Sequence, residues 1–136
     1  MSCIRANIPI TIVEGGTFDK TFQWKTGDPA VAVDLTGFTG VMTIRAKLAD
    51  VVALQSVPND AGPWVADADT GIYIYDQSVP ADVGKVRAYI KDDDTLGMCA
   101  AHKDIAGVYD LFLYSPAGEA VLQIYGVATM IAAVTR

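Results

Sequence analysis

The chain has 136 residues, of which 51% are hydrophobic and 19% charged, and this composition suits a globular domain and argues against disorder. Its net charge of −6 and its scattered basic residues make binding to nucleic acid or to an anionic membrane unexpected. The first residues contain no apolar segment of signal-peptide length, so we expect synthesis in a reducing cytoplasm. We therefore predict a single domain spanning residues 1–136.

The first part of the chain alternates between apolar and polar residues with the period of two that is typical of β-strands. Ile8–Val13 predicts a strand at a sheet edge, because Pro9 cannot donate a backbone hydrogen bond. Thr17–Lys25 predicts a second strand, whose aromatic side chains face the core. The further strands predicted in this part are Val31–Val33, Gly40–Leu48, Ala53–Val57, Thr70–Tyr75 and Lys85–Lys91.

The last part of the chain predicts a β-hairpin. Val108–Tyr114 and the apolar run Ala120–Val134 flank Ser115–Glu119, whose Pro and Gly suit a turn. The apolar run has 15 residues, fewer than the roughly 20 that a membrane helix needs, so we predict strands there. Gly126 divides the run and predicts a bulge, or a bend where the strand changes sheet. Many short strands without a helical period predict an all-β sandwich or barrel.

Few residues suggest catalysis. His102 is the only histidine, and no serine lies in a G-x-S-x-G turn, so we expect no Ser–His–Asp triad. Cys3 and Cys99 are distant in sequence and do not have the spacing of zinc ligands. We expect Cys99 to be a small apolar core residue, and whether it pairs with Cys3 stays open. The sequence predicts no catalytic residue, no cofactor and no metal.

Two acidic stretches are weighed as cation sites. Asp67 and Asp69 alternate as in calcium loops, but the rest of the EF-hand pattern is absent, so we favour a hairpin turn with Gly71 at positive φ. Asp92–Asp94 place three carboxylates side by side, and we predict a solvated loop tip. Whether either stretch binds a cation stays open.

Aromatic and apolar residues suggest binding surfaces instead. Tyr73 and Tyr75 alternate with isoleucines, so we expect them on an outer sheet face beside Tyr89, where exposed tyrosines suit a protein interface; half-buried sheet residues are the alternative. Tyr109 is a candidate for a tyrosine-corner hydrogen bond. The last strand is apolar on both faces, which suits a central strand or an edge covered by another chain. The expected interface residues are Tyr73, Tyr75, Tyr89, Val127, Thr129, Ile131 and Val134.

Four stretches in order carry a family resemblance: GGTFDKTFQWK, VDLTGFTGVMTIRAKL, DADTGIYIY and GVYDLFLYSPAGEAVLQIYGVATMIAAVTR. Together they resemble small phage virion proteins and are similar to the immunoglobulin-like N-terminal domain of phage upper baseplate proteins. The best-matching pieces are Asp34–Gly37, Ile44-Arg45, Thr70-Gly71, Tyr109–Leu111, Gly118, Gly126 and Val134–Arg136. The chain departs from the family at Phe112, where an acidic residue is usual, and in a longer stretch Gln77–Ile105.

The resemblance implies a non-enzymatic structural protein of the virion, assembled in the host cytoplasm and docked on other virion subunits as a tail or baseplate adaptor. A capsid decoration protein is the alternative. A carbohydrate-binding module of a receptor-binding fibre is the second alternative, with Trp24, Trp64 and the tyrosines as candidates for stacking on sugars. We expect an immunoglobulin-like antiparallel β-sandwich, or else a jelly roll, that forms homo-oligomers in the particle without nucleic-acid or membrane partners.

Overall fold

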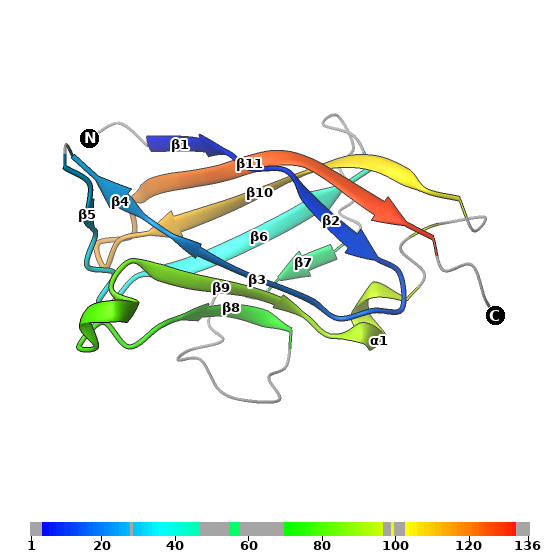
Figure 1. The fold of residues 1–136 in the computed structure, drawn as a ribbon. Coiled ribbons are helices and arrows are strands. Elements are labelled where there is room, and N and C mark those ends of the chain that lie inside the picture. Colours follow the sequence, from blue (N-terminus) through cyan, green and yellow to red (C-terminus); the bar gives the residue numbers. More distant parts are fainter. Residues whose placement is uncertain are drawn as a thin grey trace.

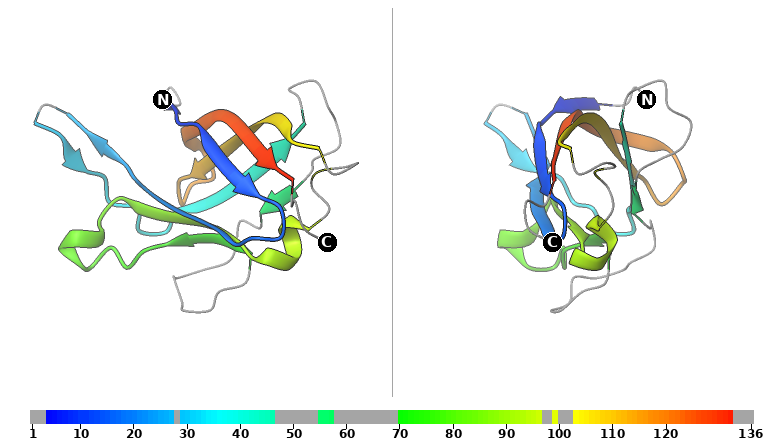
Figure 2. Two further views of the ribbon diagram at one scale, coloured as in Figure 1. Left: turned by 45° about the vertical axis from the view of Figure 1, so that its right-hand side comes forward. Right: turned by 90° about the vertical axis from the view of Figure 1, so that its right-hand side faces the viewer.

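The computed structural model describes residues 4–27, 29–46, 55–57, 70–96, 99 and 103–132. These residues form eleven strands, one short α-helix and one 3-10 turn. Two main sheets lie one over the other, as Figures 1 and 2 show from three sides. The predicted all-β sandwich is confirmed. Within the described part of the chain, no helix has the length and apolar character needed to cross a membrane.

The larger sheet has six strands. Their order is β1-β11-β10-β6-β7, and β2 pairs with β11 on the same side as β1. Strand β10 is antiparallel to both β6 and β11, whereas β1 and β2 run parallel to β11. The bounds are Ile4–Asn7 for β1, Ile10–Val13 for β2, Thr39–Arg45 for β6, Gln55–Val57 for β7, Ile105–Tyr114 for β10 and Ala120–Ile131 for β11.

The smaller sheet has the order β3-β9-β8, and all of its pairings are antiparallel. Its bounds are Phe18–Gln23 for β3, Gly71–Ile74 for β8 and Lys85–Ile90 for β9. A two-stranded ribbon, β4 (Lys25–Thr26) and β5 (Val31–Ala32), continues beyond β3. The 3-10 turn η1 (Pro80–Asp82) and the helix α1 (Asp92–Thr95) flank β9 along the chain.

Alternate residues of the strands form the core between the sheets. Phe18 and Phe22 are buried on β3, as the period of two predicts. The other fully or nearly fully buried strand residues include Ile10, Ile12, Met42, Ile44, Ile72, Val86, Ala88, Ile90, Leu111, Leu113, Leu122, Ile124, Ala128 and Met130. Each large apolar side chain buried in this way stabilises the fold by about 1.5–3 kcal/mol relative to its exposed state.

Strands β1 and β2 form the sheet edge beside β11, and Ile8 and Pro9 interrupt this edge between the two strands. The predicted edge position of Pro9 is confirmed. The amide of Ile8 still donates to the carbonyl of Tyr125, at 2.8 Å. The prediction for Gly126 is wrong, because β11 passes through this residue as one strand of one sheet with unbroken register on both sides. The glycine has a different role: a Cβ there would lie 2.6 Å from the carbonyl oxygen of Ile8.

The predicted terminal hairpin is confirmed. Its turn, Ser115–Glu119, is closed by a hydrogen bond of 2.8 Å from the Ser115 amide to the Glu119 carbonyl. Gly118 lies at φ 87°, a conformation that favours glycine. The register of β10 and β11 shifts only next to this turn, between Leu113 and Tyr114.

Candidate interaction surfaces

The outer face of the smaller sheet carries a set of aromatic and charged side chains that we call the tyrosine face. It forms because the alternate residues of β3, β8 and β9 that do not enter the core point to the opposite side. Its members are Asp19, Thr21, Tyr73, Tyr75, Lys85, Arg87 and Tyr89.

Arg87 is at the centre of the tyrosine face and is only 8% exposed. Its Nε and Nη2 atoms donate to the two carboxylate oxygens of Asp19, at 2.7 and 2.6 Å. The guanidinium carbon lies 4.7 Å from the ring centre of Tyr89. Hydrogen bonding to Asp19 is the main cause that raises the pKa of Arg87. The fork and the stacked ring therefore hold this cation in one orientation.

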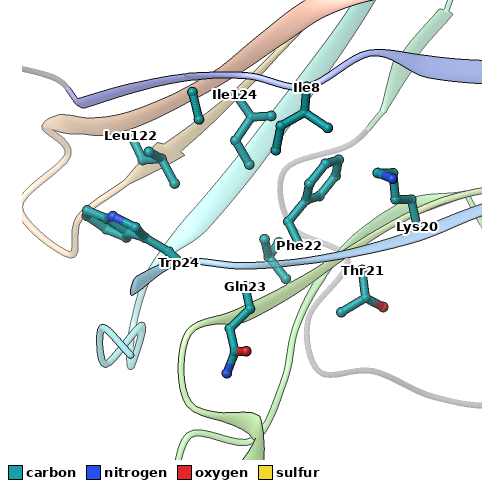
Figure 3. A pocket seen from close by; sticks show the side chains of 10 residues that line it. Ile8, Lys20, Thr21, Phe22, Gln23, Trp24, Leu122 and Ile124 are labelled. Carbon is teal, nitrogen blue, oxygen red and sulfur yellow. The ribbon is translucent and has the colours of Figure 1, made fainter. Parts of the chain in front are cut away.

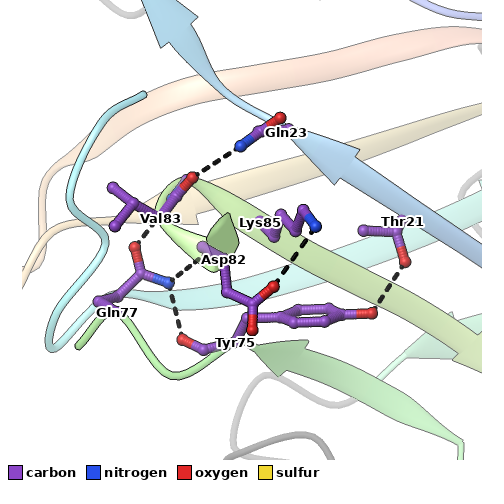
Figure 4. A network of polar contacts seen from close by, with 8 residues as sticks. Thr21, Gln23, Tyr75, Gln77, Asp82, Val83 and Lys85 are labelled. Atoms are coloured by element: carbon purple, nitrogen blue, oxygen red, sulfur yellow. Dashed lines mark hydrogen bonds and ion pairs between the residues drawn. The ribbon is translucent and has the colours of Figure 1, made fainter. Parts of the chain in front are cut away.

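Tyr75 is held in a similar way. Its hydroxyl lies 3.2 Å from the hydroxyl of Thr21, and the ammonium of Lys85 lies 5.9 Å from its ring centre. Lys85 also forms an ion pair of 3.3 Å with Asp82 (Figure 4). The rings of Tyr75 and Tyr89 are therefore each held by a neighbouring cation, and Tyr75 also by a hydrogen bond.

Gln77 fastens the loop at one end of the tyrosine face. Its Oε1 accepts hydrogen bonds from the amides of Leu35 and Gly84, both at 2.9 Å. Its Nε2 donates to the carbonyls of Tyr75 at 2.7 Å and Asp82 at 3.3 Å (Figure 4). One half-buried amide thus connects the segments of Leu35, Tyr75 and Gly84. No motif in the sequence marks Gln77, because all of its partners are backbone groups, whose hydrogen bonds leave no pattern of residue types.

The exposure predicted for Tyr73 is wrong. The residue lies opposite Arg87 in the register and so belongs to the outer side of its sheet, but only 4% of it is exposed. Tyr75 and Tyr89 are half-buried, in agreement with the alternative reading of these tyrosines. The period of two indicates on which face of the sheet a side chain lies. How deeply that side chain is buried depends on neighbours from other segments of the chain.

The outer face of the larger sheet carries exposed apolar side chains that we call the apolar face: Val13, Val127 and Ile131. Val13 and Val127 are each 51% exposed and Ile131 is 37% exposed. Val13 lies directly opposite Ile131 in the register of β2 and β11, and the half-buried Thr129 lies two residues before Ile131. Strand β11 is central in its sheet, as predicted for one of the two alternatives, but its outer face is open to solvent.

A shallow hollow of about 360 Å³ adjoins the apolar face at Val127. Arg5 crosses it, with its guanidinium 4.5 Å from the ring centre of Tyr125 and its Nε 2.9 Å from the Gln123 side-chain oxygen. Asp110 also lines the hollow, and burial raises the pKa of its carboxyl although the nearby Arg45 acts in the opposite direction. The apolar face therefore has a polar rim, as protein interfaces commonly do.

Tyr109 is buried and forms a side-chain hydrogen bond, but the tyrosine corner predicted for it is wrong. Its hydroxyl donates to the carbonyl of Ile8 at 2.5 Å, across 101 residues of sequence, rather than to backbone a few residues upstream. Burial raises the pKa of this hydroxyl far above its usual range. The bond ties β10 to the interruption between β1 and β2.

The remaining predicted positions do not form a chemical site in the described part of the chain. Asp92–Asp94 form the first turn of α1 rather than a loop tip; Asp92 and Asp93 are exposed, but Asp94 accepts a hydrogen bond from the hydroxyl of Thr70. Among the residues that the structure describes, no group of three or more His, Cys, Asp and Glu side chains is placed to hold a metal. Cys3, Trp64, Asp67, Asp69, His102 and Val134 lie outside the described residues.

Cys99 is a buried core residue, as predicted. Its amide donates to the carboxylate of Glu14 at 3.2 Å. Glu14 is itself buried, between the segments Ile8–Val13 and Thr17–Lys25 that the sequence predicts as strands. A carboxylate next to a glycine pair gave no signal of burial in the sequence.

A third surface lies where the two sheets meet along one side, and we call it the seam: Ile8, Lys20, Phe22, Trp24, Leu122 and Ile124. These residues line a mainly apolar hollow of about 290 Å³ between β3 and the β1–β2 edge (Figure 3). The seam joins residues from both ends of the chain, so no local pattern in the sequence could reveal it.

Comparison with known proteins adds no assignment. No family model matches the chain, and no curated protein does.

Proposed function

We propose that the chain is a structural phage virion protein that docks on other virion subunits as an adaptor of the tail or baseplate. The observation that carries the docking role is the apolar face, where Val13, Val127 and Ile131 stay exposed on paired strands of a sheet. The link to phage virions comes from the sequence resemblance described above. Exposed apolar residues that adjoin one another on a rigid surface indicate a protein interface more often than isolated ones do.

The strand orders support the immunoglobulin-like part of this proposal. If β3, β6, β8, β9, β10 and β11 are taken as strands B, C, D, E, F and G, the sheets have the orders B-E-D and C-F-G. Strand β7 then takes the place of the additional strand C′ that variable-type domains carry beside C. The jelly roll is the weaker alternative, because the strands of this chain match the immunoglobulin strand order without any change in their order.

Docking would gain free energy by burying apolar side chains that are now exposed to solvent. Complete burial of the exposed parts of Val13, Val127 and Ile131 would contribute about 1 kcal/mol per residue. An interface of standard size, about 800 Å² on each partner, needs more area than these residues offer. The adjoining Arg5–Tyr125 pair, already stacked, is therefore included in the proposed interface.

The capsid decoration protein remains the alternative within the same class. Decoration proteins are present in hundreds of copies per particle, so the copy number in purified particles separates the two roles. The carbohydrate-binding alternative gains little support, because cations already lie over rings of Tyr75 and Tyr89. Trp24 packs with its ring 6.5 Å from that of Phe38 and is half-buried, so it too offers little free ring area for a sugar.

Co-sedimentation of the purified chain with tails and with capsids of the phage that encodes it tests the proposal. We expect binding to tails, reduced about tenfold or more by Val127→Asp together with Ile131→Asp, because both would place a charge in the interface. Val31→Asp is the matched control, since Val31 is 65% exposed on the separate β4–β5 ribbon. A stable monomer that binds neither particle, or equal binding by all variants, would refute the docking role, and a positive glycan array would favour the carbohydrate-binding alternative.

A further inference from the structure

The seam has two strand edges that face each other and that no described strand pairs with. Strand β3 pairs with β9 and with no other described strand, and β1 and β2 pair only with β11 among the described strands. Figure 3 shows Ile8, Ile124 and Leu122 on one side of the hollow and the backbone of β3 on the other. The described strands therefore leave the sandwich open along this side.

The backbone of β3 presents hydrogen-bonding groups to the seam. The amide of Trp24 donates to the carbonyl of Gly84 on the β9 side, at 2.8 Å. In an antiparallel pair the backbone groups of successive residues point to opposite sides, so those of Asp19, Thr21 and Gln23 point away from β9, toward the seam. The side chains of Thr21 and Gln23 point away from the hollow in Figure 3, so these residues border it mainly with their backbone.

The side chains that line the seam are chemically uneven along its length. One end is the apolar hollow with Phe22 and Trp24 on the β3 side. The next hollow along the same edge, of about 420 Å³, is more polar and is lined by Thr17 and Asp19 among others. Lys20 lines both hollows and forms no ion pair in the described part of the chain; its ammonium lies 5.6 Å from the ring centre of Phe22.

We propose that the seam binds an extended segment of a partner protein, which adds a strand to the free edge of β3. The segment would direct apolar side chains of alternate residues into the hollow and place an acidic side chain next to Lys20. An extended occupant is favoured because the two hollows follow β3 end to end, and an acidic one because Lys20 is the cation that both share. The inference deepens the proposed function and rests on it only in requiring a protein partner.

Selection from a random heptapeptide library against the purified chain tests this inference without a known partner. We expect the enriched peptides to alternate apolar residues with a period of two and to contain Asp or Glu. Lys20→Glu should weaken their binding about tenfold or more, as measured by fluorescence anisotropy, and Lys20→Gln should have a smaller effect. Hydrogen exchange should show slower exchange at the amides of Asp19, Thr21 and Gln23 when the peptide is bound.

Backbone pairing is tested separately from side-chain contact. Thr21→Pro removes an amide that faces the seam, and Thr21→Val removes only the side-chain hydroxyl, so only the proline variant should lose binding. Selected peptides carrying N-methyl groups on alternate residues test the same bonds without any change to the protein. Loss of binding by one methylation pattern and its retention by the other is the expected result.

Several outcomes would overturn the inference. These are enriched peptides without alternation, binding indifferent to Lys20→Glu and to N-methylation, or no enrichment at all. A dimer of the chain that Thr21→Pro dissociates would instead assign the seam to a second copy. Retained binding of Thr21→Pro to tails, with loss in the apolar-face variants, would leave the proposed function intact while the seam proposal fails.

Discussion

Gly126→Ala should loosen the contact between β11 and the β1–β2 edge. A Cβ at this position would lie 2.6 Å from the Ile8 carbonyl oxygen and 3.0 Å from the Asn7 side-chain oxygen, so the edge has to move away. That shift strains a packed backbone, which costs about 1–3 kcal/mol. It also weakens the hydrogen bond between the Ile8 amide and the Tyr125 carbonyl, which costs about 1 kcal/mol. We expect the free energy of unfolding to fall by about 2–4 kcal/mol.

Urea denaturation followed by tryptophan fluorescence measures this loss, which should lower the midpoint by about 1–2 M for a protein of this size. Gly118→Ala is the control, because Gly118 has φ 87° but no atom within 4 Å of the added Cβ, so only the backbone conformation costs free energy, about 1 kcal/mol. An equal loss in the two variants would refute the reasoning.

A double-mutant cycle locates the effect. Tyr109→Phe removes the hydrogen bond to the Ile8 carbonyl and should cost about 1 kcal/mol. Gly126→Ala displaces the same carbonyl. The double mutant should therefore lose less free energy of unfolding than the sum of the two single-mutant losses, by about 0.5 kcal/mol or more. Strict additivity would show that the alanine strains a different contact.

The remaining predictions concern single polar groups. Gln77→Ala leaves two backbone amides without their acceptor and should lower the free energy of unfolding by about 2–3 kcal/mol in urea denaturation. Gln123→Ala is the control: it removes only an exposed hydrogen bond with Arg5 and should cost under about 1 kcal/mol, so equal losses in the two variants would contradict this expectation. Arg87→Lys cannot form the two-pronged contact with Asp19 and should cost about 1 kcal/mol in the same assay, so an unchanged midpoint would contradict the role given to the fork. The raised pKa of Asp110 means that the folded state holds the proton more tightly than the unfolded state, so stability falls as pH rises above 3.8. Asp110→Asn should therefore be more stable than the unchanged protein at pH 7, by about 0.5 kcal/mol or less after solvent screening, and equally stable at pH 3. Urea denaturation at the two pH values measures the difference, and a variant that is less stable than the unchanged protein at pH 7 would contradict the raised pKa.

Local alternation was the most reliable guide to the fold. The apolar residues of β3 and β9 enter the core as the period of two requires, and Pro9 marks an edge because it lacks an amide hydrogen. The terminal hairpin was predictable because its turn chemistry and both strands lie within one short stretch of sequence.

Predictions failed where the outcome depends on residues far away along the chain. Tyr73 takes the predicted side but is buried, since depth is set by what covers the sheet. Gly126 marks a close approach of Ile8 rather than a bulge, and Tyr109 bonds the same Ile8 carbonyl. For the candidate surfaces, Val127 and Ile131 were anticipated, whereas their neighbour Val13 and the whole seam follow only from tertiary pairing.

The parallel pairing of β1 with β11 has a consequence for biosynthesis. Ile4 lies opposite Leu122 and Ile10 lies opposite Ala128, so β1 and β2 can pair with β11 only after residues 122–131 have left the ribosome. Contacts between residues so distant in sequence form slowly, because a long loop has to close before they do. During translation the Ile-rich segment of β1 and β2 therefore stays unpaired with β11. Co-translational chaperones that recognise extended apolar stretches would bind this segment before β11 is available.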